Sequence, residues 1–167
     1  MNLPFSPNKS LHTLKISTLI GDLWITANDS AVLSITPAPS PSTYDGSDSL
    51  LTRAAIEIQE YLAQKRKSFT FPIEMRGTDF SKAVWKEAQK IPYGSTCSYA
   101  DIALRIGKPG SARAVGQALN RNPLLLVVPC HRVMAKDRSI KRFGNNFEDG
   151  IQTKIKPLAL EQDTLEP

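Results

Sequence analysis

The chain has 167 residues, a net charge of +5 and a mean hydropathy of −0.25, which allow one larger domain or two small domains that share an interface. Two cysteines are too few for a disulfide framework, no apolar run reaches the roughly 18 residues of a membrane span, and the N-terminus lacks the pattern of a signal peptide. These features exclude a membrane protein and a disulfide-rich secreted protein, and an intracellular location is expected.

The positive charge is concentrated in the second half of the chain. Residues 1–75 hold six basic and seven acidic side chains, whereas residues 76–167 hold fifteen and nine. A basic half beside a neutral half is typical of a protein whose C-terminal part faces a polyanion. A solvated basic surface would give the same pattern, and charge alone does not decide between the two.

Residues 1–73 predict a small unit of strands and one helix. Residues 13–36 alternate apolar and polar side chains in stretches, with turns at Gly21-Asp22 and Asn28-Asp29. Residues 37–49 are rich in Pro, Ser and Asp and form a loop. A helix over 50–66 follows, with possible caps at Ser47 to Ser49 and an apolar face of Leu51, Ala54, Ala55, Ile58 and Leu62. This half contains no recognisable catalytic constellation.

A second helical pattern begins at Thr78. Its apolar residues are spaced for an amphipathic helix, which the sequence Pro92-Tyr93-Gly94 would end: Phe80, Val84, Ala88 and Ile91.

The next stretch resembles a helix-turn-helix. Ser98 and Asp101 form a capping-box pattern, residues 107–110 form a turn with two glycines, and Ser111 is placed to cap a second helix. That helix predicts a buried side of Val115, Ala118 and Leu119 and an opposite polar side of Arg113, Gln117 and Asn120, flanked by Ala114 and Gly116. A polar face with small neighbours suits the groove of a nucleic acid, although two short helices around a glycine-containing turn are common elsewhere.

The strongest candidate for chemistry is Cys130. The apolar residues 124–128 predict a buried extended segment, Pro129 interrupts it, and His131 and Arg132 follow the cysteine. Cationic neighbours lower the pKa of a thiol and so favour the nucleophilic thiolate. Neighbours on a strand point to opposite faces, so either the chain turns after Pro129 or a water relays the proton to His131. An inert buried cysteine is the alternative.

The sequence Pro-Cys-His-Arg-Val (129–133) resembles the active-site signature of the O6-alkylguanine-DNA alkyltransferases. Further motifs occur in the order and spacing of that family, most densely over 77–133: Gly77-Thr-x-Phe80, Val84-Trp85, Ile91-Pro-Tyr-Gly94, Ser98-Tyr99, Ser111-Ala-Arg-Ala-Val-Gly116 and Asn122-Pro123. The resemblance implies an α+β fold: a small N-terminal α/β domain of ribonuclease H type (1–73), and a C-terminal domain (77–167), mainly helical, with a winged helix-turn-helix-like DNA-binding unit.

The resemblance also implies the reaction. Cys130 would take the alkyl group of a flipped O6-alkylguanine, and also of O4-alkylthymine, in one irreversible transfer per molecule. The partner would be double-stranded DNA carrying the lesion, and no metal or other cofactor would be needed. We expect a monomer with no membrane partner; cooperative binding on DNA is left open.

The family's functional residues match named positions. His131 resembles the base that deprotonates Cys130 through a water, and Glu161 the carboxylate that orients this histidine. Tyr99 would rotate the target phosphate and help to protonate the leaving guanine. Arg113 resembles the finger that fills the space left by the flipped base, on a helix that enters the minor groove. The remaining matches are DNA contacts at Ser98, Ala114, Gly116 and Gln117, a hinge at Asn122, and pocket residues Pro129, Val133, Phe143 and Gly144.

Several positions depart from the family pattern or have a structural explanation. Phe143 stands where tyrosine is common, and residues 144–150 form a longer loop than usual. Lys156-Pro157 interrupts the expected final helix, so Pro157 is expected in the first turn of a shorter helix; the assignment of Glu161 depends on this register. For Arg132 we prefer an ion pair that holds the loop to a direct catalytic role.

Three other functions were weighed against alkyl transfer. A lesion-binding protein that flips and flags alkylated bases would lack the acceptor cysteine, which is present here. A cysteine hydrolase would need an oxyanion site, and the sequence contains no separate motif for one. A plain helix-turn-helix regulator would leave the Cys-His-Arg segment unexplained.

Overall fold

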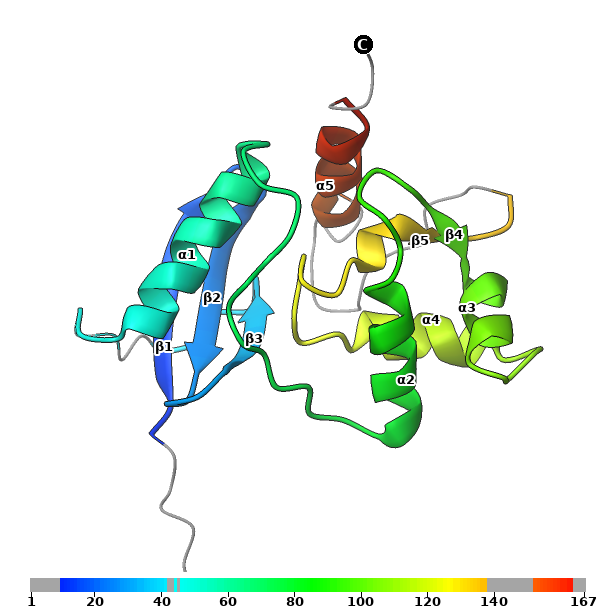
Figure 1. Cartoon of the computed structure of the whole chain (residues 1–167), viewed down its shortest axis with the longest axis horizontal. Helices are drawn as coiled ribbons and strands as arrows, with labels where there is room; N and C mark the ends of the chain where they lie inside the picture. The colour runs from blue at the N-terminus through cyan, green and yellow to red at the C-terminus, as the bar shows by residue number, and fades with distance from the viewer. Residues whose placement is uncertain (1–9, 42–43, 45, 138–151, 164–167) are drawn as a thin grey trace, which may run out of the picture.

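The computed structural model describes residues 10–41, 44, 46–137 and 152–163, except for the side chains of 152–155. The chain has an α+β fold in which a three-stranded antiparallel sheet and one helix lie beside a helical C-terminal half (Figure 1). The final helix lies near the junction between the two halves.

The sheet has the order β1-β2-β3 and comes from the region in which strands were predicted. β1 (His12–Thr18), β2 (Gly21–Ala27) and β3 (Val32–Thr36) are joined by short turns. The first turn lies at Leu19 and Ile20, so Gly21, predicted within it, instead opens β2 with a φ of 110°. In the second turn the Asn28 side chain accepts hydrogen bonds from the N–H groups of Ser30 and Ala31.

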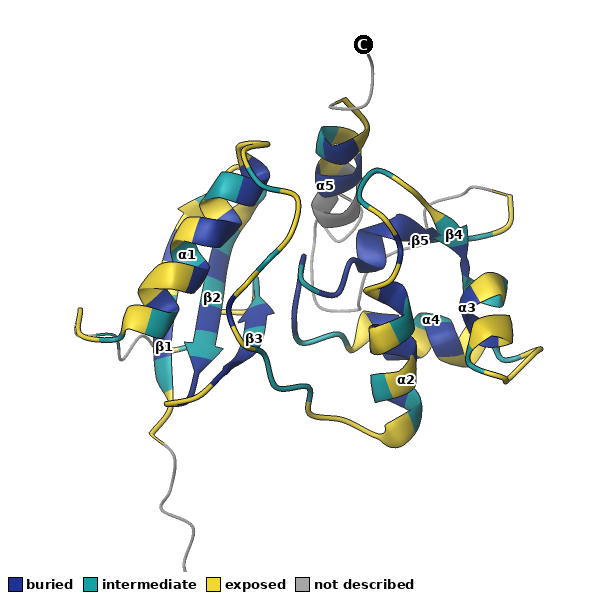
Figure 2. Ribbon diagram, in the orientation of Figure 1, coloured by how far each residue is buried: buried dark blue, intermediate teal, exposed yellow. Residues whose placement is uncertain are grey.

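The helix α1 (Ser49–Leu62) packs its buried side on the sheet (Figure 2). Asp48 is its N-cap and accepts from the N–H groups of Leu50 and Leu51. The helix ends four residues before the predicted residue 66. Gln64 adopts a left-handed φ of 61°, and Lys65 N–H donates back to the Glu60 carbonyl. This Schellman-type end turns the chain away from the helix axis.

The helices of the C-terminal half begin close to the predicted positions. Thr78 caps α2 (Asp79–Ala88), and Ser98 and Asp101 form the predicted capping box of α3 (Tyr99–Arg105). Ser111 precedes α4 (Ala112–Asn120), but its predicted side-chain cap is wrong. The Ser111 hydroxyl donates to the Lys108 carbonyl within the preceding turn and is therefore directed away from the helix.

Residues 124–128 are buried as predicted, except for the half-buried Val127, but are not extended throughout. Leu126 has a left-handed φ of 70°, and Val128 N–H donates to the Leu124 carbonyl, so the segment folds into a turn. Its first part continues the sheet: Leu125 N–H donates to the Ile35 carbonyl at the edge of β3. This backbone pairing joins the two halves of the chain.

The segment after this turn carries the candidate active site. Residues Cys130–Arg132 form the short 3-10 helix η1, and β5 (Val133–Met134) pairs in parallel with β4 (Cys97–Ser98).

The last helix, α5 (Gln152–Asp163), packs on η1 and contains Pro157 in its interior. The expectation that Pro157 lies in the first turn of a shorter helix is therefore wrong. Proline has no N–H for the helical hydrogen bond, but the packing of the following residues, including the buried Leu158 and Glu161, keeps the helix continuous.

Buried apolar side chains from both halves form one continuous core. α1 contributes Ile58 and Leu62, β3 contributes Ile35, and the C-terminal half contributes Trp85 and Leu126. Within the residues that the structure describes, no helix is long and apolar enough to cross a membrane.

Gly77 tests this packing. A Cβ at position 77 would lie 2.7 Å from the Trp85 ring, which is buried and donates from Nε1 to the Ala118 carbonyl. Because the ring has no room to yield, we expect Gly77→Ala to lower the free energy of unfolding by about 1–3 kcal/mol, measured by urea denaturation.

Gly116→Ala is the matched control. A Cβ there would lie 3.8 Å from the Tyr99 ring, an ordinary contact, on a helix that favours alanine. This variant should unfold at the same urea concentration as the parent protein or a higher one. Equal stability of Gly77→Ala and the parent would contradict the packing described for Trp85.

Candidate active site

Cys130 is the first residue of η1 and is buried. Cys130 N–H donates to the Val128 carbonyl, and Arg132 N–H donates to the Pro129 carbonyl. The chain thus turns directly after Pro129, which was one of the two possibilities left open by the sequence.

Asn122 connects the cysteine to the end of α4. Its Nδ2 donates to the Val128 carbonyl at 3.1 Å and reaches the Cys130 sulfur at 3.3 Å, while its Oδ1 accepts from Leu124 N–H. An N–H donor at the sulfur stabilises the thiolate relative to the thiol. This residue, predicted as a hinge, links the segment after α4 to Cys130.

His131 and Glu161 form a buried pair beside the cysteine. Nε2 of His131 lies 2.6 Å from Oε1 of Glu161, and both side chains are almost completely buried. A proton on Nε2 that is shared with the carboxylate makes Nδ1 the basic nitrogen of the neutral ring. The structure therefore brings Glu161, the carboxylate predicted to orient the histidine, together with His131, the residue directly after Cys130.

Glu161 accepts hydrogen bonds from several segments of the chain. Arg132 donates to both of its oxygens, at 2.8 Å from Nε and 2.9 Å from Nη2, and Gly94 N–H donates to Oε2 at 2.9 Å. Burial on its own raises the pKa of a carboxyl group, but the hydrogen bonds from His131 and Arg132 hold the pKa of Glu161 far below its ordinary value of 4.5. The carboxylate stays charged.

Arg132 forms the ion pair that was expected to hold the loop. Besides Glu161, its Nη1 donates to the Ile91 carbonyl at 2.7 Å, and its guanidinium lies 5.7 Å from the centroid of the Tyr93 ring. These contacts tie η1 to the chain that follows α2.

Tyr99 opens α3 and is half-buried beside Gly116. Burial, and then the negative charge of Cys130, raise the pKa of Tyr99 to about 12. The hydroxyl is therefore protonated at neutral pH and electrostatically coupled to the cysteine.

The outer face of α4 has the predicted composition. Arg113, Ala114 and Gln117 are exposed and Gly116 is half-buried, while Val115, Ala118 and Leu119 are buried. Ser98, also predicted to contact DNA, is buried, and its side chain caps α3.

The predicted pocket is described only in part. Pro129 and Val133 are buried on either side of η1. Phe143, Gly144 and the rest of the loop to residue 150 lie outside the described residues.

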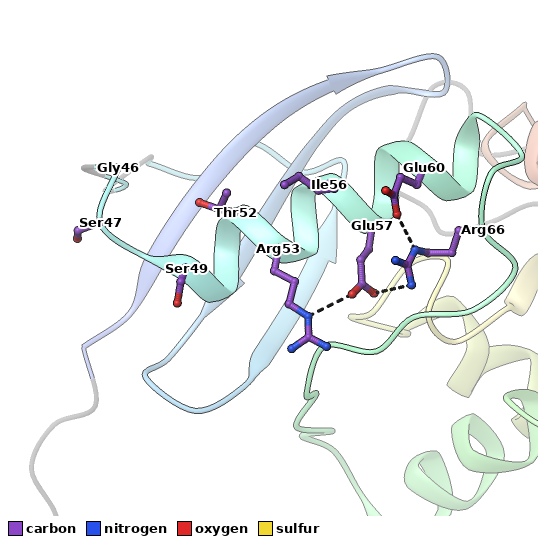
Figure 3. A pocket seen from close by; sticks show the side chains of 9 residues that line it. All are labelled: Gly46, Ser47, Ser49, Thr52, Arg53, Ile56, Glu57, Glu60 and Arg66. Atoms are coloured by element: carbon purple, nitrogen blue, oxygen red, sulfur yellow. Dashed lines mark hydrogen bonds and ion pairs between the residues drawn. The ribbon is translucent and has the colours of Figure 1, made fainter.

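Cavities also occur in the described parts of the chain away from the face of α4. One, of about 220 Å³, lies behind the cysteine loop and is lined by Lys67, Ser68, Phe69, Gln89, Leu126, Val127, Pro129 and Arg132. Another, of about 430 Å³, lies on the outer side of α1 (Figure 3). There Glu57 pairs with Arg53 and Arg66, and Glu60 also pairs with Arg66.

Tyr61 is the site residue that the sequence analysis missed. It lies on the buried side of α1, in the half predicted to hold no catalytic group, and its hydroxyl donates to Oε1 of Glu161. The available signal was its position three residues after Ile58 on the apolar face, because a buried tyrosine hydroxyl usually has a hydrogen-bond partner.

Cys97, the second cysteine, has a different environment. It is half-buried opposite Val133 in the β4–β5 pair, and burial raises the pKa of its thiol to about 11. Over the described residues, no group of three or more His, Cys, Asp or Glu side chains is arranged to hold a metal ion.

Comparison with known proteins adds evidence that does not depend on the geometry of the site. Residues 79–163 match the family model described as "6-O-methylguanine DNA methyltransferase, DNA binding domain". The inducible methylated-DNA–protein-cysteine methyltransferase of Bacillus subtilis is 50% identical over 101 residues, and that of Mycobacterium tuberculosis is 35% identical over 157 residues. The matches cover 60% and 91% of this chain and 56% and 93% of the relatives. The chain thus spans little more than half of the B. subtilis protein.

Solved structures agree over both halves of the chain. The crystal structure of M. tuberculosis O6-methylguanine methyltransferase superposes with a TM-score of 0.81 at 34% identity, covering 92% of this chain and 94% of that one. The M. tuberculosis protein in complex with DNA gives a TM-score of 0.80 at 35% identity, covering 91% and 93%.

The buried carboxylate predicts a large, pH-dependent contribution to stability. Glu161→Gln would leave Arg132 buried without its ion-pair partner, so we expect a loss of about 3 kcal/mol in the free energy of unfolding at neutral pH, measured by urea denaturation. Because the folded pKa of Glu161 is depressed, the stabilisation by its charge is complete above about pH 4.5 and is lost as the pH falls through the folded pKa. The difference between parent and variant should therefore narrow below pH 4.5.

Glu60→Gln is the control for this variant. Glu60 pairs with Arg66, but its side chain is 40% exposed, so its removal should cost less than about 1 kcal/mol. A difference between parent and Glu161→Gln that stays constant from pH 7 to pH 3 would contradict the charged state assigned to Glu161.

Proposed function

The chain belongs to the O6-methylguanine DNA methyltransferase family, and from this membership and the geometry of the site we propose that it repairs alkylated DNA by transferring an alkyl group from O6-alkylguanine to Cys130. The observation that carries the proposal is the arrangement at η1. Asn122 donates to the Cys130 sulfur at 3.3 Å, and His131, next to it, is held 2.6 Å from Glu161. A cysteine with a donor at its sulfur and an oriented base beside it is an activated nucleophile.

The first step is deprotonation of Cys130. A water carries the proton from the sulfur to Nδ1 of His131, and Glu161 stabilises the imidazolium through Nε2. The sulfur then attacks the alkyl carbon in line with the bond to O6. The sulfur–carbon bond forms while the carbon–O6 bond breaks, and its electron pair stays with the guanine.

The second requirement is a proton for the leaving guanine. Burial, and then the charge of a thiolate at Cys130, raise the pKa of Tyr99, so its hydroxyl is still protonated when the sulfur attacks. Its hydroxyl is suited to donate this proton and to turn the target phosphate. The thioether at Cys130 has no route back to a thiol in this scheme, so each molecule reacts once.

DNA binding is assigned to the exposed face of α4. The published M. tuberculosis complex with DNA, which superposes on this chain, supports a DNA partner. We assign α3 and α4 to a helix-turn-helix, completed as a winged unit by the β4–β5 region, in a C-terminal domain of residues 77–167. The sheet and α1 correspond to a ribonuclease H-like domain of residues 1–73.

The exposed Arg113 suits a base-flipping role. It lies in the first turn of α4, next to Ala114 and one turn before Gln117. Small residues on this face let the backbone approach the minor groove, and the guanidinium can occupy the space of the extruded base. We include Phe143 and Gly144 in the guanine pocket and O4-alkylthymine among the substrates. We expect the protein to act as a monomer, in the compartment that holds the cell's DNA.

The direct test incubates the protein with a DNA duplex that carries one radiolabelled O6-methylguanine and measures where the radioactive label is found. We expect at most one label per protein molecule, bound covalently to Cys130 and located by peptide mapping. Catalytic turnover, or tight binding with the label left on the DNA, would contradict alkyl transfer; the second result would support a protein that only flags lesions.

The matched variants are Cys130→Ala and Cys97→Ala. Cys130→Ala should bind the duplex and acquire no label. Cys97→Ala should acquire the label as the parent does, because Cys97 is the half-buried cysteine with the raised pKa.

The proposed flipping role of Arg113 predicts that its substitution slows transfer more from duplex DNA, in which the target base is stacked, than from single-stranded DNA. Arg113→Ala and Arg113→Lys should both slow transfer from a duplex by at least about tenfold, because 1.4 kcal/mol of lost stabilisation of the flipped state has that effect. Lysine keeps the charge but not the planar group. Neither variant should slow transfer from a single-stranded oligonucleotide to the same degree. An equal loss on both substrates would exclude the flipping role.

A further inference from the structure

Tyr61 lies where the N-terminal half meets the active site. It is the thirteenth residue of α1, only 2% exposed, and its partners Glu161 and His131 come from α5 and η1. It is separated from Glu161 by 100 residues in the sequence. The inference drawn from this contact rests on the proposed alkyl transfer.

The Tyr61 hydroxyl and His131 use the same carboxylate oxygen. Oε1 of Glu161 accepts from the Tyr61 hydroxyl and lies 2.6 Å from Nε2 of His131, and the two donors are 3.3 Å apart. Oε2 accepts from Arg132 Nε and from Gly94 N–H, and Arg132 Nη2 donates to Oε1 as well, at 2.9 Å. Each hydrogen bond to Oε1 neutralises part of the negative charge of the carboxylate. It therefore weakens the electrostatic attraction between Glu161 and a protonated His131.

The ring of Tyr61 is fixed by aromatic neighbours. Its centroid lies 5.0 Å from that of Phe69 and 5.9 Å from that of Tyr93, the latter edge to face. Tyr93 in turn contacts the guanidinium of Arg132. The hydroxyl is therefore held at Glu161 by packing as well as by its hydrogen bond.

We infer that Tyr61 is a positioning residue of the proton relay, which sets how strongly Glu161 stabilises the protonated form of His131. By donating to Oε1 it weakens the attraction of the carboxylate for the imidazolium. His131 is thus kept neutral, and able to accept the proton of Cys130, down to a lower pH than Glu161 alone would allow. In this way the N-terminal half contributes to the chemistry of the C-terminal half.

The other groups around His131 do not replace this effect. The titratable or charged groups around it in the described contacts include Tyr61 from α1, Glu161 from α5, its neighbours Cys130 and Arg132 in η1, and Tyr99 from α3 through Cys130. Arg132 acts on both oxygens of Glu161, but its guanidinium is always charged. Burial, and then the charge of Glu161, raise the pKa of Tyr61, so its hydroxyl remains a donor throughout the functional range.

The test is the pH dependence of His131 in Tyr61→Phe. Phenylalanine keeps the ring that packs on Phe69 and Tyr93 and removes only the hydroxyl. The protein has two histidines, so imidazole nitrogen NMR of the full chain, assigned with His12→Gln, resolves the titration of His131. We expect the midpoint to rise by about half a pH unit or more in Tyr61→Phe. The acid limb of the single-turnover transfer rate at saturating DNA should rise with it.

The matched control is Tyr44→Phe. The Tyr44 hydroxyl is hydrogen-bonded to the hydroxyl of Thr52, which lies on α1 as Tyr61 does. Tyr44 has no bond to Glu161 among the described contacts. This variant should leave the His131 titration and the transfer rate unchanged. A ring-fluorinated tyrosine at position 61, which has the same shape and is a stronger donor, should lower the midpoint and so tests the inference even if Tyr61→Phe is unstable.

The outcomes separate the two proposals. An unchanged or lowered midpoint in Tyr61→Phe, even with reduced stability, would overturn the role of Tyr61. Absence of label on the parent protein would overturn alkyl transfer itself, while the NMR titration would still report whether Tyr61 acts on His131.

Discussion

The buried carboxylate of Glu161 is the interaction on which the arrangement of the site depends. It accepts hydrogen bonds from Tyr61 in α1, Gly94 after α2, and His131 and Arg132 in η1. Removing a carboxylate from water is costly, and this cost is offset only because so many donors, one of them a permanent cation, surround it. The same donors fix the positions of four segments relative to one another.

A second link joins Cys130 to the end of α4, whose exposed face is the proposed DNA contact. Asn122 lies two residues after the end of α4 and bonds to the Val128 carbonyl and the Cys130 sulfur. A displacement of α4 on binding a polyanion would therefore reach Cys130 through one side chain. The exposed face of α4 and the buried cysteine are thus connected, and Tyr99 packs against Gly116 between them.

The N-terminal half contributes to the candidate site as well as to the core. Its sheet is extended by the backbone pairing between Ile35 and Leu125, and its helix supplies Tyr61 to the carboxylate. The turn that leads into Pro129 is thus braced from the side opposite to α4. If the proposed proton relay operates here, this support from two sides lowers the energy lost to reorganisation when charge moves through it.

The sequence by itself determined the features that depend on neighbouring residues. The capping box at Ser98 and the buried face of α4 follow from local preferences, and the motif at 129–133 singled out Cys130 and His131 as the candidate nucleophile and base. Only the tertiary structure decided the end of α1 at Leu62, the turn at Leu126, the helical position of Pro157, and the contact of Tyr61 with Glu161. The end of α1 involves the locally left-handed Gln64, whereas the other three depend on contacts between distant segments, because packing and long-range hydrogen bonds outweigh local propensities.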